Sequence, residues 1–269
     1  MSSTDTKNGD PLMLECWNCG HEFESQTLGY VIDSDLAAEA CPRCGYHFQT
    51  PPLRPRDFDE LARSPEDHPR WTLSDEEVSR RLPALDLIVD DDVREETARL
   101  SASAPAYFWR APAANPQSDY HHPLCREDHG LWAHTLMLLA PLSRYEESLR
   151  AQDRLTLEQR DYAISAAILH DQRKRGPHGT TGGSSTSDHA VVMADVIREE
   201  SALPNAVAGA VECHMGPEEW GYDGAEPAND LADLVHMADM LASTANADLH
   251  VPGPVPEELR DLGLQEGDY

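Results

Sequence analysis

Lysine is almost absent from this chain. Lys7 and Lys174 are the only lysines among 269 residues, and 21 basic residues face 49 acidic ones, for a formal net charge of −28. Nonspecific DNA binding needs clustered Lys and Arg to displace counterions, so this composition argues against it. The acidic residues are spread along the whole chain, which favours a halophilic protein over a mesophilic one with acidic disordered ends, because concentrated salt screens acidic repulsion. In a halophile, where nearly every protein would be acidic, the argument against DNA binding loses force.

The chain also lacks a long apolar run and a disulfide framework. No stretch approaches the roughly 18 consecutive apolar residues that suggest a transmembrane helix. The first ten residues, MSSTDTKNGD, are polar and show no signal peptide. Four of the six cysteines form two CxxC pairs, while Cys125 and Cys213 stand alone, a pattern typical of metal binding in a reducing compartment. We therefore expect a cytoplasmic protein with no membrane segment.

Proline, glycine and apolar periodicity divide the chain into parts. Ser74 and Glu77 predict a capping box that opens a helix, and Pro83 is expected to interrupt or end it. Further helices are predicted at about 93–103, 129–147, 157–171, 187–201, 204–214 and 229–246. No strand is expected after residue 60. The expected units are a disordered N-terminus (1–11), a cysteine-containing β module (12–50), a proline-rich linker (51–75), a helical domain (76–250) and a loose acidic tail (251–269).

The two cysteine pairs predict a structural zinc site. Cys16 and Cys19 form the first pair, Cys41 and Cys44 form the second, and each pair is followed by a glycine that permits the turn around an ion. A redox dithiol would need a thioredoxin-like βαβ context, which the sequence lacks. Four thiolates leave no open coordination position, so we expect this zinc ribbon to serve folding or contact with a protein or nucleic acid.

A second set of candidate metal ligands lies in the helical part. His170 and Asp171 end the apolar helix YAISAAILHD, and an adjacent imidazole and carboxylate can hold a divalent ion. An isolated pair of this kind can equally be a helix C-terminus, with a dipole-stabilised histidine and a solvated aspartate.

Two more polar residues interrupt apolar helices. Asp239 lies four residues after Val235, on or beside the apolar face of LADLVHMADMLA. A carboxylate directed into a core is costly unless it is paired or bound to metal, although an Arg partner or a helix-edge position would also satisfy it. His134 lies within GLWAHTLMLL, where a lone histidine is usually a satisfied core residue. His236 either supports Asp239 or is an ordinary core histidine.

The order of these residues resembles the HD superfamily of metal-dependent phosphohydrolases, in which the positions of His134, His170, Asp171 and Asp239 bind metal. The segments 111–114, 121–122 and 130–136 are similar to the run that opens the catalytic domain of HD-type 3′-5′ exoribonucleases and of some plasmid relaxase-associated HD proteins. The resemblance covers about half of the chain. It implies a mainly α fold, with an HD-type helical bundle at 76–250 behind the small β zinc ribbon.

The resemblance also implies roles for residues around the pair. The segment 170–174 resembles the HD-x-G-K signature, with Arg173 where glycine is usual and Lys174 in register to bind substrate phosphate. Arg173 and Arg175 are further candidates for phosphate contact. The extra histidines of members with two metals are matched by His189 and His214, although Cys213 stands where some relatives have a second histidine. Two residues are either pocket residues or exposed loop histidines, His121 and His122.

This ligand set implies a reaction class. Two ions about 3.5–4 Å apart would share Asp171 and activate a water for attack on phosphorus, so Asp171 and Lys174 are the expected catalytic residues. Mixed His/Asp ligation suits one or two ions of Mn, Fe, Co or Ni and tolerates Mg. The loop 176–187, GPHGTTGGSSTS, is either a lid over this site or simple disorder.

The expected substrate is a nucleotide or the 3′ end of a single-stranded nucleic acid, hydrolysed at a phosphoester bond. Nucleotide monophosphatase, dNTP hydrolase and cyclic-nucleotide phosphodiesterase activities all remain open within this class. The alternative is a catalytically silent HD-type nucleotide sensor or adaptor that uses the zinc ribbon for partner contact. A DNA-binding regulator ranks last, because the ribbon lacks a basic recognition surface. The sequence does not define the oligomeric state.

Overall fold

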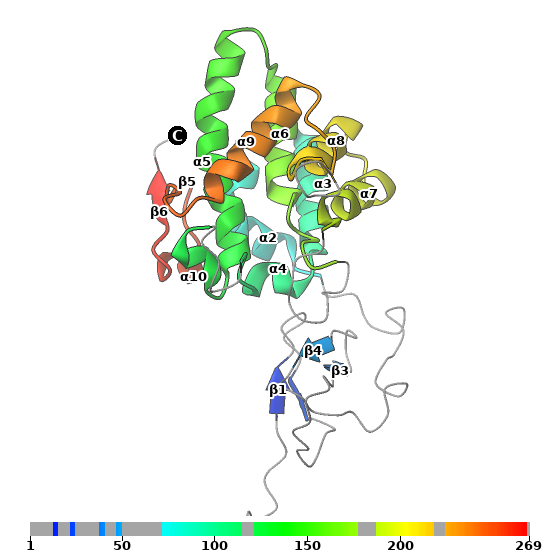
Figure 1. Ribbon diagram of the computed structural model, residues 1–269, viewed down its shortest axis with the longest axis vertical. Helices are drawn as coiled ribbons and strands as arrows, with labels where there is room; N and C mark the ends of the chain where they lie inside the picture. The colour runs from blue at the N-terminus through cyan, green and yellow to red at the C-terminus, as the bar shows by residue number, and fades with distance from the viewer. Residues whose placement is uncertain are drawn as a thin grey trace, which may run out of the picture.

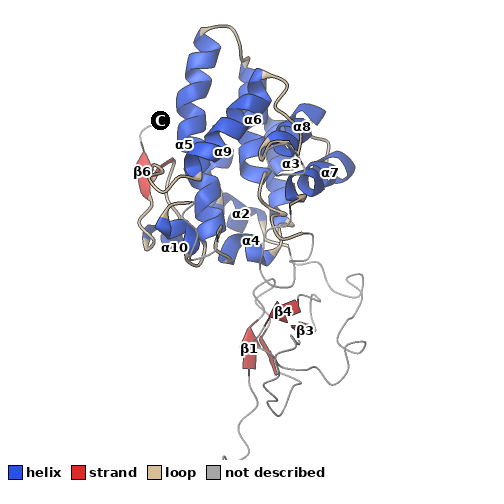
Figure 2. Cartoon of the chain, viewed as in Figure 1, coloured by secondary structure: helices blue, strands red, loops and turns tan. Residues whose placement is uncertain are grey.

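The computed structural model describes four short strands near the N-terminus and most of the helical region. The described residues are 13–15, 22–24, 38–40, 47–49, 72–114, 121–176, 187–217 and 224–267. Figure 2 shows that helices dominate, which confirms the predicted mainly α class. No helix in these ranges is long and apolar enough to cross a membrane.

The four N-terminal strands form two antiparallel pairs. β1 (Met13–Glu15) pairs with β2 (Glu22–Glu24), and β3 (Ala38–Ala40) pairs with β4 (His47–Gln49). In the chain, each pair brackets one CxxC motif, because 16–21 separates β1 from β2 and 41–46 separates β3 from β4. The four cysteines themselves, Cys16, Cys19, Cys41 and Cys44, lie outside the described residues, so the zinc ribbon stays a prediction.

The helical domain begins as the capping signal indicates. α2 (Asp75–Arg81) starts at Ser74, whose hydroxyl accepts a hydrogen bond from the Glu77 backbone N–H. The second hydrogen bond of a capping box, from the Ser74 backbone N–H to the Glu77 side chain, is not formed. The Glu77 carboxylate accepts hydrogen bonds from Arg80 and Arg81 instead. Pro83 opens the 3₁₀ helix η2 (Pro83–Leu87), as its fixed φ and missing N–H favour, and α3 (Asp91–Ala102) follows.

Five further helices complete the bundle, and their positions confirm the predicted periodicity. They are α5 (Gly130–Ala151), α6 (Leu157–Leu169), α7 (His189–Glu200), α8 (Asn205–Cys213) and α9 (Asp230–Ala242). Residues 130–142 of α5 are all buried, which is the pattern of a helix surrounded by neighbours on every side. Figure 1 shows α9 crossing α5, while α7 and α8 pack together at the other side of α6.

A short α-helix and a short 3₁₀ helix pack against the N-terminal part of α5. α4 (Ala106–Arg110) and η3 (Pro123–Arg126) are too brief for periodicity to reveal, and both escaped prediction. Trp109 of α4 and Trp132 of α5 are buried and meet edge to face, with ring centroids 5.6 Å apart. The guanidinium of Arg81 lies 5.2 Å and 5.5 Å from the centroids of these rings, which ties α2 to the same cluster.

The C-terminal segment corrects two predictions. β5 (His250–Pro252) pairs in parallel with β6 (Gln265–Gly267), and α10 (Glu257–Arg260) lies between them. The expectations of no strand after residue 60 and of a loose tail at 251–269 are therefore wrong for the described part. The physical reason is a buried apolar set that the acidic composition obscured: Val251, Val255, Leu259 and Leu264. The prolines do not oppose this order, because Pro252 ends a strand and Pro256 caps α10.

Candidate metal centre

Five helices bring six ionisable side chains to one buried point. His134 comes from α5, His170 and Asp171 from the end of α6, and the others are His189 at the start of α7, His214 at the end of α8 and Asp239 on α9. Each of the six is at most 3% exposed. Residues more than 100 positions apart in the chain therefore meet in the core, as the resemblance implied.

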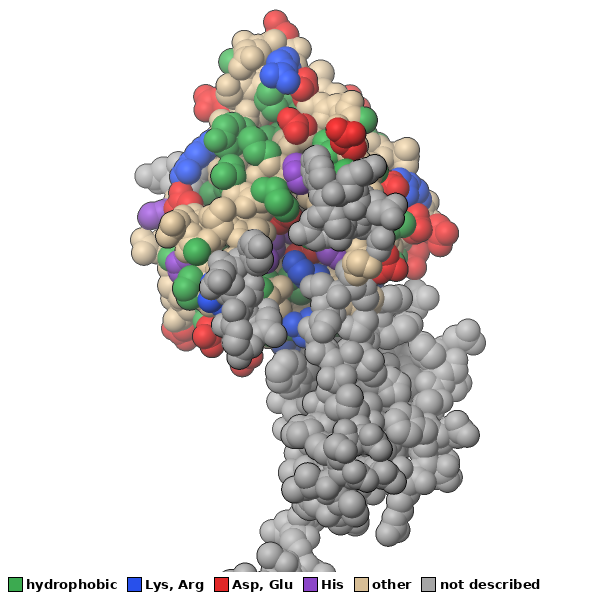
Figure 3. All heavy atoms as spheres, viewed as in Figure 1, with side chains coloured by type: hydrophobic (Ala, Val, Ile, Leu, Met, Phe, Trp, Pro, Cys, Tyr) green, Lys and Arg blue, Asp and Glu red, His purple; other side chains and the backbone are tan. Residues whose placement is uncertain are grey.

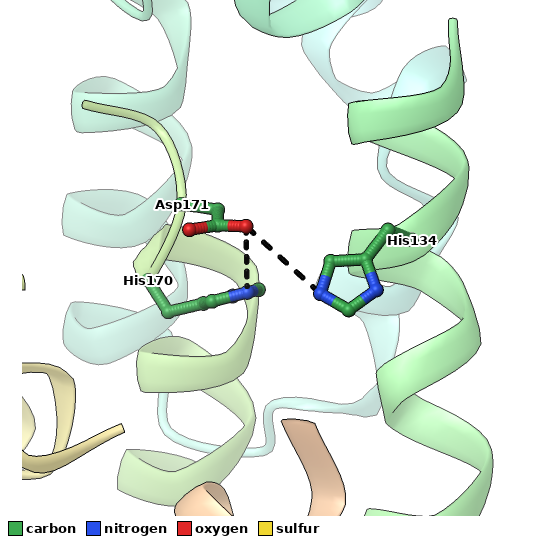
Figure 4. Close-up of side chains that lie close together, drawn as sticks. All are labelled: His134, His170 and Asp171. Carbon is green, nitrogen blue, oxygen red and sulfur yellow. Dashed lines mark ion pairs between the residues drawn. The ribbon is translucent and has the colours of Figure 1, made fainter. Parts of the chain in front are cut away.

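The first ligand group consists of His134, His170, Asp171 and Asp239. Nε2 of His134 lies 2.9 Å from Oδ1 of Asp239 and 3.9 Å from Oδ2 of Asp171. Nε2 of His170 lies 3.4 Å from the same Oδ2 and 3.8 Å from Oδ1 of Asp239. Figure 4 shows His134 and the His170-Asp171 pair facing each other from neighbouring helices. Two imidazoles and two carboxylates thus converge.

The second ligand group consists of Asp171, His189 and His214. Oδ1 of Asp171 lies 3.2 Å from Nε2 of His189 and 3.7 Å from Nε2 of His214. The two histidine Nε2 atoms are 3.2 Å apart. Asp171 therefore presents one carboxylate oxygen to each group. The set of His134, His170 and Asp171 and the set of Asp171, His189 and His214 each have the compactness of a metal-binding cluster.

The unmet hydrogen-bonding capacity of the cluster fits a metal ion. Within the described part of the chain, Nε2 of His170 and Oδ1 of Asp171 are buried without a hydrogen-bond partner. Burying such atoms is costly, and a cation in the first group would satisfy Nε2 of His170 while a cation in the second would satisfy Oδ1 of Asp171. The Nδ1 atoms of His170 and His214 lie 2.7 Å and 2.6 Å from the carbonyls of Ala167 and Val211, to which they can donate. That hydrogen bond assigns the lone pair to Nε2, as a metal-binding imidazole requires.

The electrostatics of the cluster set the protonation states. Burial opposes ionisation of Asp171, but Lys174 and His170 outweigh it and hold its pKa well below the ordinary value. Burial likewise opposes ionisation of Asp239, and the hydrogen bond from His134 keeps its pKa low. Burial lowers the pKa of His214 to about 4. Two carboxylates and a neutral His214 are the charge states in which these groups bind metal.

The turn after Asp171 accommodates Arg173 in place of glycine. Backbone N–H groups of Gln172, Lys174 and Gly176 donate to carbonyls three residues earlier, and the left-handed residue is Gly176, at φ 75°. The Tyr107 hydroxyl donates to the Gly176 carbonyl at 2.8 Å and accepts from the Arg175 N–H at 3.2 Å. Tyr107 thus organises this turn, a role that its place in a five-residue helix did not reveal.

The three cations of the turn have different surroundings. Lys174 Nζ donates to Oδ2 of Asp171 at 2.6 Å, so the ammonium lies at the first ligand group. Arg173 is buried, which lowers its pKa, and its Nη1 donates to the Gln172 carbonyl. Arg175 donates to the Pro112 carbonyl. Lys174 is the cation that the structure brings into hydrogen-bond contact with Asp171, while Arg173 and Arg175 each donate a hydrogen bond to a backbone carbonyl.

Three further histidines were candidates in the sequence. His121 lies beside the cluster, with its ring centroid 5.0 Å from that of His134, and burial lowers its pKa to about 3. His122 instead caps η3, because its Nδ1 accepts the Leu124 N–H. His236 lies with Nδ1 2.7 Å from the His214 carbonyl, so it supports the turn that carries His214. The contact of His121 with Ser243 had no signal in the sequence.

The comparison with protein families agrees with this geometry. A model described as HD domain matches residues 131–244. No curated protein and no solved structure matches the chain. The matched segment contains all six side chains of the buried cluster, which could hold a divalent metal ion. Residues 131–244 of this chain thus form an HD domain, a type associated with metal-dependent phosphohydrolases.

Proposed function

We propose that this protein hydrolyses a phosphoester bond of a nucleotide or of a nucleic-acid 3′ end. The observation that carries the proposal is the position of Asp171, whose two oxygens face separate histidine groups. This is the arrangement expected of a carboxylate shared by two ions. The ordered run at 111–114 and 121–122, similar to that of HD-type exoribonucleases, favours a nucleic-acid substrate within this class.

The ligand chemistry supports a divalent transition metal or Mg²⁺. His134, His170, Asp171 and Asp239 would hold one ion, and Asp171, His189 and His214 would hold the other. Imidazole and carboxylate together suit Mn²⁺, Fe²⁺, Co²⁺ and Ni²⁺ and tolerate Mg²⁺. Bound ions of this kind polarise a phosphoryl oxygen and lower the pKa of water.

The protein side chains have tasks of their own. Lys174 carries a compact positive charge beside Asp171, where it can bind an oxygen of the substrate phosphate. Charge that develops on that oxygen is stabilised strongly in a site that excludes water. His121, on the other side of His134, is neutral near pH 7 because burial lowers its pKa to about 3, so it can orient substrate without adding charge.

We further propose that the two cysteine pairs bind a structural zinc ion. A structural zinc ion bound by Cys16, Cys19, Cys41 and Cys44 would order the N-terminal strands, and the resulting ribbon would contact nucleic acid or a protein partner. The matching six-residue connections between β1 and β2 and between β3 and β4 support two equivalent zinc knuckles.

The deciding experiment is a substrate panel with metal-loaded full-length protein in molar KCl. The panel contains 2′,3′-cyclic and ordinary nucleotides, dNTPs, and short single-stranded RNA and DNA, each with Mn²⁺, Mg²⁺, Co²⁺ or Ni²⁺. Turnover that disappears in Asp171→Ala supports the proposal, and the preferred substrate selects the subclass. Asp233→Ala is the matched control, because Asp233 is an exposed aspartate on α9 that is not part of the buried cluster. Absence of turnover with every metal would favour the silent sensor.

A further inference from the structure

The backbone turn that carries Asp171 and Lys174 takes one hydrogen-bond partner from another element. In this turn, backbone N–H groups donate to carbonyls three residues earlier, as Lys174 does to Asp171 at 3.0 Å. The Arg175 N–H departs from the pattern and donates to the Tyr107 hydroxyl at 3.2 Å. The same hydroxyl lies 3.3 Å from the Gln172 carbonyl, the acceptor that the pattern would give to Arg175. The phenol oxygen therefore serves Arg175 as an acceptor in place of a backbone carbonyl.

The Tyr107 side chain is built for a fixed bridging role. It is fully buried, and burial raises the pKa of its hydroxyl, so the group keeps its proton. The single proton of a phenol is donated once, and the Gly176 carbonyl at 2.8 Å is the nearer acceptor. Tyr107 thus donates to Gly176 and accepts from Arg175. Both ends of these hydrogen bonds are buried, so neither is easily replaced by water.

A second contact holds the same segment against the turn. The Arg175 guanidinium donates to the Pro112 carbonyl at 2.9 Å, five residues after Tyr107 in the chain. Tyr107 reaches the turn through its side chain, and Pro112 is reached from the turn by a side chain. The segment from α4 to Pro112 is therefore joined to the turn at both of its ends.

The segment is also joined to the helix that supplies His134. The Leu131 N–H donates to the Ala111 carbonyl at 2.9 Å, and Leu131 lies three residues, or about one helical turn, before His134 on α5. One short segment is thus hydrogen-bonded to α5 and to the turn after α6. Nε2 of His134 and Oδ2 of Asp171, which face each other across this junction in Figure 4, are 3.9 Å apart. The segment is placed to fix that separation.

The turn leads from the buried cluster toward the surface. Asp171 is 1% exposed, whereas Lys174 and Arg175 are each 7% exposed. Figure 3 shows histidine and basic side chains visible together in one hollow of the helical domain. A shift of the turn would move both the shared carboxylate and the ammonium, which lies 2.6 Å from it. Metal and phosphate sites need their groups held within about 0.5 Å, so a support for this turn is a requirement of the site.

We propose that Tyr107 is a positioning residue of the metal centre. Its hydroxyl fixes the backbone of the turn at Arg175, and so sets where the Asp171 carboxylate and the Lys174 ammonium lie relative to His134. The inference rests on the proposed function for the presence of the ions. It goes beyond that function by assigning the geometry of the shared ligand to a residue that is not one of the six cluster side chains and lies outside the matched segment 131–244.

The test is calorimetric titration of full-length protein with Mn²⁺. Tyr107→Phe removes the hydroxyl and keeps the buried ring. Partners that orient metal ligands are worth roughly 10- to 100-fold in metal affinity, and Tyr107 acts through backbone, so we expect Mn²⁺ binding to weaken by about tenfold. Tyr162→Phe is the matched control, because the Tyr162 hydroxyl on α6 donates to the exposed Glu158 at 2.6 Å, away from the cluster. This control should leave Mn²⁺ affinity unchanged.

A second control separates positioning from general stability. Thr97→Val removes another buried hydroxyl, which donates to the Val93 carbonyl at 2.7 Å and lies 2.6 Å from Oγ of Ser165, between α3 and α6. We expect Thr97→Val and Tyr107→Phe both to lower the melting temperature in EDTA, and only Tyr107→Phe to weaken Mn²⁺ binding. If Tyr107→Phe lacks the circular dichroism of the native fold, Arg175→Lys replaces it. That variant keeps the charge, loses the guanidinium contact with the Pro112 carbonyl and should also weaken Mn²⁺ binding.

The outcomes distinguish this inference from the proposed function. Unchanged Mn²⁺ affinity in a folded Tyr107→Phe protein would overturn the positioning role. An equal loss of Mn²⁺ affinity in Thr97→Val would also overturn it, because the effect would then be one of stability alone. Mn²⁺ binding that weakens in Tyr107→Phe alone, in a protein that turns over no substrate of the panel, would retain the positioning role and reject the hydrolase.

Discussion

His170 and His214 occupy equivalent positions in the two ligand groups, yet their pKa values shift in opposite directions. Each follows the last residue of its helix, each is fully buried, and each can donate from Nδ1 to the carbonyl three residues earlier. Burial favours the neutral form of both. The carboxylates of Asp171 and Asp239 outweigh burial at His170 and raise its pKa, whereas burial prevails at His214 and lowers its pKa to about 4.

The difference lies in the number of carboxylates that each histidine meets. His170 has oxygens of both aspartates within 3.8 Å, while His214 has Asp171 at 3.7 Å and lies close to His189. The first ligand group is therefore richer in negative charge and the second richer in imidazole. Hard ions such as Mg²⁺ and Mn²⁺ should prefer the first group, and Co²⁺ or Ni²⁺ should tolerate the second.

Asp171 is common to both groups, so its loss should have the largest effect. In Asp171→Asn, each ion loses its shared carboxylate, and we expect activity to fall by more than about 100-fold, beyond the usual effect of losing a supporting partner. Metal content by elemental analysis should fall at both sites. Normal content at either site, with the circular dichroism of the native fold, would show that Asp171 is not shared.

Replacing His134 and His189 in separate variants should impair the two ligand groups one at a time. His134→Asn removes a ligand of the first group alone, and His189→Asn removes a ligand of the second alone. We expect each variant to bind one of the two ions more weakly by at least roughly 10- to 100-fold, the effect of losing only a supporting partner. Calorimetric titration with Mn²⁺ checks this, with His250→Asn, an exposed histidine on β5, as control. Identical binding curves for the two variants would mean that the groups are a single site.

Lys174 contacts the first group through Asp171 and should distinguish metal binding from substrate binding. The ammonium must leave Oδ2 before an ion can use that oxygen, so we expect Lys174→Met to tighten Mn²⁺ binding at the first group by about tenfold, since a charged hydrogen bond contributes roughly 1.5–3 kcal/mol. The same variant should weaken phosphate binding, because the cation is gone. If both affinities fall together, Lys174 stabilises the site and does not compete for Asp171.

How far the sequence predicted this centre differs between the two groups. In the first group, His134, the His170-Asp171 pair and Asp239 are visible in the sequence as polar residues that interrupt apolar helices, and the family resemblance then joins them into one ligand set. The second depends on where the ends of α7 and α8 meet, so His189 and His214 were available only through the family resemblance. The tertiary contacts of Tyr107 and His121 have no local signal. The ordered C-terminal segment could not be predicted from composition for the same reason. Val251 and Leu264 are buried by tertiary packing, and the local sequence has no periodic apolar pattern that would indicate it.

The opposite pKa shifts of His170 and His214 should appear as opposite pH dependences of stability in metal-free protein. Above pH 6.5 both side chains are neutral in the unfolded chain. As pH falls from 6.5 toward 4, the unfolded state protonates His214 and the native state does not, so stability decreases, by at most about 1.4 kcal/mol per pH unit. His170 has the opposite sign and acts above pH 6.5: its raised pKa makes the native state bind the proton first, so its contribution is fully present below pH 6.5 and is lost as pH rises through the native pKa.

Glutamine at each position removes the titration and keeps a hydrogen-bond donor for the backbone carbonyl. We expect the loss of melting temperature between pH 8 and pH 5, measured in EDTA, to become smaller in His214→Gln and larger in His170→Gln than in the unaltered protein. Comparing each variant with itself at two pH values cancels the constant cost of the substitution. Changes of the same sign in both variants would contradict the inference that the second carboxylate, and not burial, separates the two histidines.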